Sequence, residues 1–361
     1  MVRKITDLTM QITAGANVVT VVIMLLIGLS DRLDPTVHPV LAVAGLLFPV
    51  FILINICFMF FFAVFRKRYM LITFAGLILS YFPIRTYCPL NLTADPPEGA
   101  IKVLSYNVNN FSRADVPEGA PNPIFQYIVD SGADIVCIQE GMFLKTEEDV
   151  LKTIYLCADT VTNSNKRDNL MIMSKFPLIA KKHIPYTSEN NLSGAFFVKI
   201  GTDTVVVINN HFERTGLSME DRAEFKKMMK GKSERDTMRQ ESRRLLSKLS
   251  ESSRIRAPQA EAVARFISKC KYKVILCGDF NDSPISYTRR RLARELTDCY
   301  VATGNGPGFS YHRNAMYVRI DNIMCSKDIT PYGCKVDRSI GYSDHYPVYC
   351  RLKIDGKDKK H

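Results

Sequence analysis

The sequence predicts a layered α/β sandwich preceded by a membrane anchor. Three uncharged, apolar runs fill most of residues 1–87, whereas many short strand-like segments and only a few helices fill the remainder. Short strands joined as hairpins favour layered sheets over a doubly wound parallel sheet. The chain has 361 residues, of which 47% are hydrophobic, so one large domain and an additional segment fit its length.

The anchor is the first predicted element. No charged residue lies between Asp7 and Asp31, from Pro39 to Phe65, or from Tyr69 to Ile84. A bilayer is crossed by about 20 apolar residues, and the third run is shorter, so Arg68 and Arg85 must reach towards the headgroups. A cleaved signal peptide is the alternative for the first run, which the two following apolar runs disfavour. We predict spans at about residues 10–30, 39–65 and 69–85.

Basic residues orient the predicted spans. Arg3 and Lys4 precede the first run, and Arg66-Lys67-Arg68 separates the second run from the third. Such residues concentrate on the cytoplasmic side of a membrane. With three spans, the chain is a multi-pass integral membrane protein whose remaining residues lie outside the cytoplasm. If the third run only lies along the interface, those residues are cytoplasmic instead.

Beyond the anchor at residues 1–87, the chain is water-soluble in character. We predict a proline-rich linker at 88–99, a folded domain at 100–354 and a charged tail at 355–361. The strands expected in the domain lie at 101–107, 134–139, 169–174, 178–184, 194–200, 204–209, 273–278, 309–312, 318–325 and 346–352. The expected helices lie at 123–131 and 147–153, with a long charged helical stretch at 219–269.

The formal net charge of +12 indicates anionic partners. Nucleic acid, anionic lipid headgroups and phosphorylated small molecules all fit that charge. The basic stretch from Arg222 to Arg256 is interpreted either as a solvated helical face or as a surface that follows phosphates. The sequence has ten cysteines, but Cys137, Cys277 and Cys325 lie in apolar runs, and no cysteine spacing is typical of a zinc site.

One turn carries the strongest chemical signal. The turn is Gly278-Asp279-Phe280-Asn281-Asp282, and the apolar run before it predicts a buried strand. It places a carboxylate and a carboxamide at the carboxyl end of a strand, where α/β proteins tend to place reactive groups. Taken alone, the turn is explained as well by the ordinary turn preferences of Asp and Asn.

Further polar residues end or interrupt other predicted strands. Taken singly, each is ordinarily structural: an acid caps a helix, and a histidine is a satisfied core residue. Taken together they supply oxygen ligands and His/Asp pairs, and Mg²⁺ prefers hard oxygen ligands and few protein contacts. These residues are Asn107, Glu140, His211, Asp321, Asp344 and His345.

This ordered set of motifs resembles the endonuclease/exonuclease/phosphatase superfamily from about Ile101 to Leu352. The resemblance implies a four-layer sandwich in which helices flank two mainly antiparallel or mixed sheets, with the site where strand ends meet. It also implies a metal-dependent phosphoesterase that uses Mg²⁺, with Mn²⁺ as the alternative. Glu140 would be the principal metal ligand, and Asn107 and Asp344 would lie close to the metal or its waters.

The resemblance also implies catalytic roles. Asp279 would orient and deprotonate the attacking water, and Asn281 would hold a phosphoryl oxygen. His345, oriented by Asp321, would stabilise charge in the transition state or move a proton. His211 is a second candidate proton donor, and its Asn-x-His setting resembles the deoxyribonuclease and sphingomyelinase branches more than the apurinic endonucleases. Phosphodiester hydrolysis needs these elements: a nucleophile, charge neutralisation and a proton for the leaving oxygen.

Three functions remain open from the sequence. The first is a membrane-anchored, nuclease-like hydrolase of phosphodiester or phosphomonoester bonds. The second is a sphingomyelinase-like phosphodiesterase or phosphatase acting on lipid headgroups, because an anchor raises the effective concentration of a membrane substrate. The third is a non-catalytic membrane-bound binding module, which would be recognised by the loss of a ligand or histidine; none is lost here.

Overall fold

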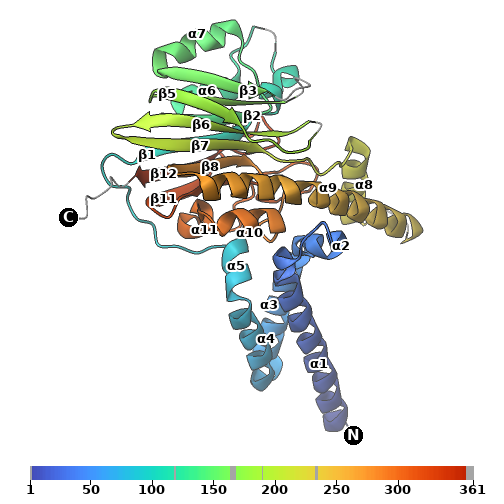
Figure 1. Cartoon of the computed structure of the whole chain (residues 1–361). Helices are drawn as coiled ribbons and strands as arrows, with labels where there is room; N and C mark the ends of the chain where they lie inside the picture. The colour runs from blue at the N-terminus through green and yellow to red at the C-terminus, as the bar shows by residue number, and fades with distance from the viewer. Residues whose placement is uncertain (1, 118, 163–167, 189, 232–234, 355–361) are drawn as a thin grey trace, which may run out of the picture.

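The computed structural model describes residues 2–117, 119–162, 168–188, 190–231 and 235–354, so the predicted tail at 355–361 lies outside the described residues. The N-terminal helices form a stalk below a body of two stacked sheets (Figure 1). The body confirms the predicted sandwich of mixed sheets flanked by helices.

In the described part of the chain, two six-stranded sheets form the body. Each has one parallel pair, β1 with β2 and β7 with β8, among otherwise antiparallel neighbours. The first sheet runs in the order β11 (Ile329–Val336), β12 (Val348–Ile354), β1 (Ile101–Asn107), β2 (Ile135–Gln139), β4 (Asn169–Ser174), β3 (Cys157–Thr162). The second runs β5 (Leu178–His183), β6 (Leu192–Ile200), β7 (Asp203–His211), β8 (Lys273–Asp279), β10 (Asp321–Cys325), β9 (Thr297–Asp298).

The apolar side chains of alternating strand residues separate into three layers of core. Val103 and Cys137 of the first sheet pack against Phe196 and Ile275 of the second, between the sheets. The outer face of the first sheet is covered by α6 (Pro123–Asp130) and α7 (Lys145–Ile154). The outer face of the second sheet is covered by α9 (Arg235–Lys269) and α10 (Tyr287–Ala293), and α11 (Cys299–Thr303) follows β9.

Several predicted elements differ from the structure. The prediction of a strand at 309–312 was wrong, because Tyr311 makes only isolated bridges, to Val318 and to His345. The stretch at 219–269 is two helices, α8 (Met219–Met229) and α9, and the strand expected at 318–325 begins only at Asp321. Two longer strands were not predicted from the sequence. One is β3, a half-exposed edge strand, and the other is β11, in which Pro331 and Gly333 weaken the strand signal.

The stalk consists of apolar helices. Among the described residues, the segments 4–32 and 39–65 are helices long and apolar enough to cross a membrane, and the third helical run passes that test only as a pair bent by 66°. The longer helices are α1 (Val2–Gly28), α3 (Phe48–Phe65), α4 (Lys67–Leu79) and α5 (Tyr81–Tyr87). The loop between α1 and α3 contains η1 (Ser30–Arg32), α2 (Pro39–Ala42) and η2 (Val43–Leu47).

A buried polar network joins three of these helices. Asn17 of α1 donates through Nδ2 to Oδ1 of Asn55 on α3, at 3.0 Å. Thr73 of α4 donates to Oδ1 of Asn17 at 2.8 Å, and Thr20 donates to Oδ1 of Asn55 at 3.1 Å. Polar groups in apolar surroundings need such partners, and hydrogen bonds between helices hold membrane bundles together. The network therefore packs α4 into one bundle with α1 and α3.

The stalk is packed against the body. The guanidinium of Arg319, which is 2% exposed, donates to the carbonyl oxygens of Thr86 and Tyr87 at the end of α5. In the loop between α1 and α3, a Cβ on Gly45 would lie 2.0 Å from the carbonyl oxygen of Ile285, so only glycine permits this approach. These contacts fix the stalk against the body, with Gly45 beside the segment that links β8 to α10.

Candidate active site

The site begins with a row of three side chains across the second sheet. His211 is paired in register with Asp279, and Asp279 with Asp321, at the ends of β7, β8 and β10. The φ of Gly278 is 130°, and a Cβ there would lie 2.0 Å from the carbonyl oxygen of Asn210. Because only glycine tolerates both conditions, Gly278 allows the strands to come together directly before Asp279.

The first sheet contributes two further side chains. Asn107 and Gln139 are paired in register at the ends of the parallel strands β1 and β2, and Glu140 follows with a positive φ of 55°. Asn107 donates through Nδ2 to Oε1 of Glu140 at 2.9 Å and to Oδ2 of Asp279 at 3.2 Å. Its Oδ1 accepts from the backbone N–H of Asn109. Asn107 thus connects carboxylates from the two sheets. Its contact with a metal ion or the waters of that ion stays a prediction.

Buried amides hold the two sheets together below the site. Gln139 donates to Oδ1 of Asn209 on β7 at 2.6 Å. Asn209 in turn donates to the carbonyl oxygens of Ile138 and Met171, both at 3.0 Å. Buried amides with satisfied partners specify one arrangement of the elements that they join. These bonds explain why strand ends from separate sheets meet at one place.

Two His/Asp pairs flank Asp279. Nδ1 of His345 lies 2.8 Å from Oδ2 of Asp321, and Nδ1 of His211 lies 2.6 Å from Oδ2 of Asp168. The opposite ring nitrogens, Nε2 of His345 and Nε2 of His211, lie 3.7 and 3.9 Å from the same atom, Oδ2 of Asp279. A carboxylate at Nδ1 fixes the orientation of each ring and favours its protonated form.

These charges shift the pKa values of the three groups. Burial lowers the pKa of both histidines, but the neighbouring carboxylates outweigh it and raise the pKa of His211 to about 9 and that of His345 to about 10. Burial and the Asp321 carboxylate raise the pKa of Asp279 to about 6, against the two histidines, which lower it. Near neutral pH the site therefore combines two protonated imidazoles with a carboxylate able to accept a proton.

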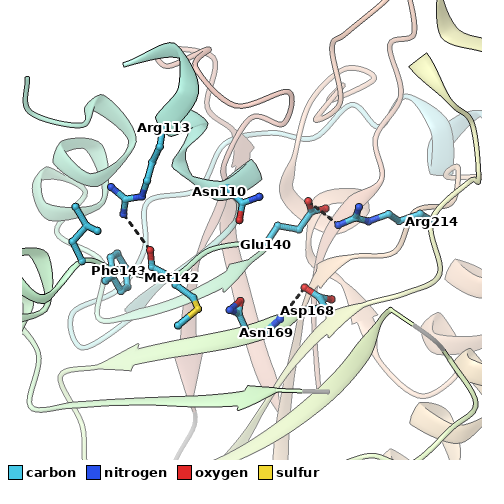
Figure 2. Close-up of a pocket in the computed structure, with 9 residues that line it drawn as sticks. Asn110, Arg113, Glu140, Met142, Phe143, Asp168, Asn169 and Arg214 are labelled. Atoms are coloured by element: carbon cyan, nitrogen blue, oxygen red, sulfur yellow. Dashed lines mark hydrogen bonds and ion pairs between the residues drawn. The ribbon is translucent and has the colours of Figure 1, made fainter. Parts of the chain in front are cut away.

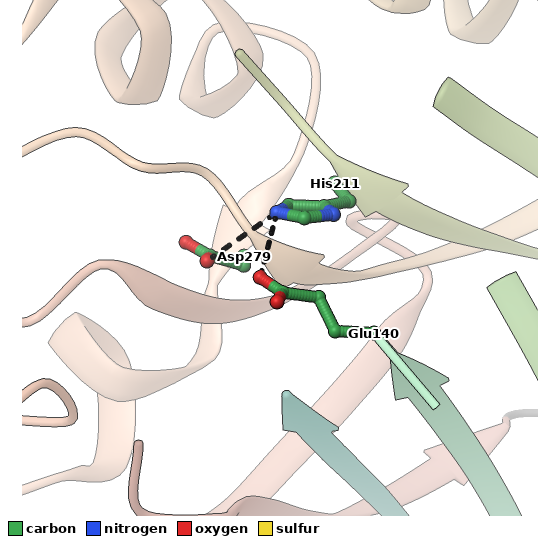
Figure 3. A group of neighbouring side chains, drawn as sticks. All are labelled: Glu140, His211 and Asp279. Atoms are coloured by element: carbon green, nitrogen blue, oxygen red, sulfur yellow. Dashed lines mark ion pairs between the residues drawn. The ribbon is translucent and has the colours of Figure 1, made fainter. Parts of the chain in front are cut away.

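Glu140 lies at the edge of this group. Its Oε2 is 2.8 Å from the guanidinium of Arg214 (Figure 2), and its Oε1 is 3.3 Å from Nε2 of His211. Figure 3 shows the His211 ring facing both Glu140 and Asp279. Burial raises the pKa of Glu140, but His211, Arg214 and Asn107 outweigh it and lower the pKa below the ordinary value.

The structure places the other predicted residues as follows. Asn281 has a positive φ of 51°, and its backbone N–H donates to Oδ1 of Asp279 at 2.8 Å. Its side-chain nitrogen donates to the carbonyl oxygen of Phe212 at 2.9 Å. Asp344 precedes His345 and is half-buried, but its carboxylate belongs to neither group of metal-competent side chains found among the described residues.

Two residues of the site, Asp168 and Arg214, were not predicted from the sequence. Asp168 directly precedes β4 of the first sheet, yet it contacts a histidine on the second, so no local pattern connects the two. An acid next to an apolar strand was its only signal. Arg214 lies three residues beyond His211, and an exposed arginine after a strand carries no signal of its own.

A cavity of about 400 Å³ opens beside Glu140 (Figure 2). Arg113 lies at one end, where Glu147 holds it at 2.6 Å, and Arg214 lies at the other. Between them the lining mixes amide groups with apolar side chains, namely Asn110, Met142, Phe143, Leu144 and Asn169. This lining can bind a ligand that carries polar as well as apolar groups.

The donor atoms suit a divalent cation. Oxygen and imidazole nitrogen atoms of Glu140, His211 and Asp279 lie within 4.8 Å of one another, and so do those of Asp279, Asp321 and His345. Within the described part of the chain, the buried Oδ1 of Asp321 has no hydrogen-bond partner. The carboxylate oxygens of these groups are hard ligands that suit Mg²⁺ or Mn²⁺, whereas the two imidazoles, when protonated, cannot bind a metal.

Known proteins share this architecture. A family model for the Endonuclease/Exonuclease/phosphatase family matches residues 104–345, and a model for a domain of unknown function matches residues 10–87. The human Nocturnin catalytic domain with bound sulfate is similar, with a TM-score of 0.50, 17% identity and coverage of 73% of this chain and 96% of that chain. An endonuclease/exonuclease/phosphatase from Bacteroides vulgatus has a TM-score of 0.50, 14% identity and coverage of 72% and 100%. No curated protein matches the chain.

Proposed function

The chain belongs to the Endonuclease/Exonuclease/phosphatase family, and we propose that it is a membrane-anchored, Mg²⁺-dependent hydrolase of phosphodiester bonds. One observation carries this proposal: two carboxylate-oriented imidazoles face the same oxygen of Asp279. A general base between two cationic groups fits a reaction in which water attacks an anionic phosphoryl centre.

Each proposed step uses one of the described side chains. Asp279 accepts a proton from the attacking water, and its pKa of about 6 makes the base form available near neutral pH. His345, held by Asp321, donates its Nε2 proton to the leaving oxygen, so one proton enters the site and one leaves it. His211 offers a second positive charge to the phosphoryl oxygens, and Asn281 supports Asp279 through its backbone N–H.

Glu140 would hold the metal, with Asn107 and Asp344 near it or its waters. The ion would neutralise charge on the phosphoryl group and help to orient it. In this structure Arg214 neutralises the Glu140 carboxylate. The Arg214 side chain is 55% exposed, so it can turn towards solvent when a metal ion binds to Glu140.

The anchor is proposed to cross the membrane three times, with the catalytic domain outside the cytoplasm. Asp7 near the N-terminus pairs with Arg66 at the turn between α3 and α4, so both basic clusters of the anchor lie at the same end of the stalk. The body lies at the opposite end (Figure 1). We propose domain boundaries at 1–87, 88–99 and 100–354, and the family models at 10–87 and 104–345 support them.

A nuclease-like activity is the first proposal for the substrate, because the chain carries a large positive charge. Hydrolysis of lipid headgroups is the second, and one observation favours it. Ile285, in the segment after Asp279, packs on Gly45 of the anchor, and Arg290 of α10 lies 3.5 Å from Asp31. The anchor therefore holds the segment after Asp279 close to the end of the stalk at which the chain would leave the membrane.

The deciding experiment uses the full chain in lipid nanodiscs, because the anchor packs against the catalytic domain. Nicking of supercoiled plasmid and release of phosphorylated headgroups from phospholipid and sphingolipid are measured with Mg²⁺ and with chelator. Asp279→Ala is the inactive variant, and Asp149→Ala, at an exposed position on α7, is the matched control. Metal-dependent nicking absent from Asp279→Ala supports the nuclease, and headgroup release alone supports the lipid substrate. A protein that binds Mg²⁺ but turns over neither substrate supports the non-catalytic module.

A further inference from the structure

A basic helical arm extends from the catalytic domain. We define the basic arm as residues 219–231, which comprise α8 and the turn after it, together with residues 235–250 of α9. The remainder of α9 packs on the second sheet through Val263, Ala264 and Ile267. The α9 part of the arm projects sideways beyond the body, near the level at which the stalk meets it, and α8 lies above α9, on the side away from the stalk (Figure 1).

Several basic side chains of the arm have no acidic partner among the residues that the structure describes. Lys227 pairs with Glu224, and Arg244 and Lys248 pair with the buried Asp221. Five further basic residues are exposed and form no ion pair with any residue that the structure describes. These residues are Lys226, Lys230, Arg235, Arg239 and Arg243.

Apolar side chains are exposed among these cations. Met219 is 70% exposed, Met229 is 65% exposed and Leu246 is 41% exposed. A helical surface that combines basic groups with flexible apolar side chains is typical of segments that lie in a membrane interface.

The helix that carries most of the arm is next to the anchor. α9 packs against α2 and η2, which lie in the loop between the first two apolar helices. That loop is at the end of the stalk from which the chain would leave a membrane, so the α9 part of the arm extends near the height of the headgroups. We propose that the basic arm lies on the anionic headgroups of the leaflet nearest the catalytic domain.

The arm is also bonded to the active site. The guanidinium of Arg222 on α8 donates to the hydroxyl of Tyr311 and lies 5.5 Å from the centre of its ring. The Tyr311 ring packs edge-on to His345, with 5.2 Å between ring centres. Contact of the arm with headgroups would therefore hold the active site in a fixed orientation above the leaflet.

Amide hydrogen exchange of the full chain in nanodiscs tests this proposal. Discs of phosphatidylcholine alone are compared with discs that also contain phosphatidylglycerol. Because several basic residues each add to the attraction of an anionic surface, we expect amides of the arm to exchange at least about tenfold more slowly in the anionic discs. The protection should fade as salt is added, because salt screens the attraction.

Charge reversal supplies the matched variants. Lys226→Glu combined with Lys230→Glu and Arg239→Glu should abolish the difference between the two kinds of disc. Arg265→Glu combined with Lys269→Glu, at exposed positions near the other end of α9, should leave the difference intact. All of these positions are on the surface. If a variant nevertheless folds poorly, the salt series measured on the wild-type chain still tests the proposal.

Two results would overturn the proposal. One is equal exchange of the arm in both kinds of disc. The other is protection that appears only when DNA is added to phosphatidylcholine discs, which would assign the arm to nucleic acid. Amide exchange does not require turnover, so the result stands whichever substrate the active site hydrolyses.

Discussion

Nε2 of His211 and Nε2 of His345 face the same oxygen atom, Oδ2 of Asp279, at 3.9 and 3.7 Å. The two histidines come from different parts of the chain, and each has its own carboxylate at Nδ1, Asp168 for the first and Asp321 for the second. The arrangement is nearly symmetrical about Asp279. It separates a base that loses its proton near pH 6 from two acids that keep theirs well above neutrality.

The first prediction concerns the pH dependence of kcat/KM. Asp279 accepts a proton only when ionised, so activity should rise as the pH increases through its pKa of about 6. His345 donates only when protonated, so activity should fall as the pH increases through its pKa of about 10. A bell-shaped profile is expected, and His345→Ala should lose its alkaline limb together with all but about a hundredth of the activity. An unchanged alkaline limb in that variant would remove His345 from the role of acid.

The second prediction concerns stability. The pKa of Asp279 is raised on folding, so its contribution to stability is full below about pH 4 and is lost as the pH rises to about 6. Asp279→Asn should therefore inactivate the protein, yet raise the free energy of unfolding by about 3 kcal/mol above that pH in the presence of chelator. Thermal unfolding in detergent measures the change, which should vanish near pH 4. Asp236→Asn, at an exposed position, is the control; a variant no more stable than this control at alkaline pH contradicts the prediction.

The third prediction concerns Asp168. Its carboxylate is the main group that raises the pKa of His211, so Asp168→Asn should lower that pKa well below about 9. The imidazole resonances of His211 in an NMR titration report this directly, and kcat should fall by at least about tenfold because the ring loses its orienting partner. Asp159→Asn, which removes an exposed partner of Lys181, should leave the His211 titration unchanged. Equal titration curves for the wild type and Asp168→Asn would show that the pair has no electrostatic role.

The fourth prediction concerns Glu140. Replacing its carboxylate with an amide in Glu140→Gln removes a charged oxygen from the predicted metal site. We expect the Mg²⁺ concentration that gives half-maximal activity to rise by at least about tenfold. Calorimetric titration of Mg²⁺ into the protein should show the same loss of affinity. Glu148→Gln on the surface of α7 is the control. A Mg²⁺ titration identical to that of the wild type would argue against Glu140 as a ligand.

The fifth prediction concerns topology. A reporter enzyme that is active only outside the cytoplasm, fused after His361, should be active, because three spans carry the body across the membrane. The same reporter fused after Lys67, between the second and third helices of the bundle, should be silent. A His361 fusion active only with a cytoplasmic reporter would show that α4 and α5 do not cross.

Local patterns in the sequence predicted much of the fold and of the site. The alternation of apolar residues marked most strands, and Glu140, His211 and Asp279 stood out because each follows or ends an apolar strand. The edge strands β3, β9 and β11 were missed because their short or interrupted apolar patterns are weak, whereas β5, also at a sheet edge, was predicted. Asp168 was missed for another reason: its partner lies on the other sheet, and only packing brings them together.

The sequence by itself determined the layered class of the body, the apolar character of the anchor and the residues at the strand ends, because hydrophobic periodicity and turn chemistry are local properties of the chain. Tertiary structure alone decided which carboxylate orients which histidine and where the anchor rests on the body. It also decided that the basic residues after His211 form an arm beside the anchor. Those relationships depend on strand register and on contacts between residues distant in sequence, such as Gly45 with Ile285 and Arg222 with Tyr311. No pattern along the chain encodes such contacts, because they exist only after the elements have packed.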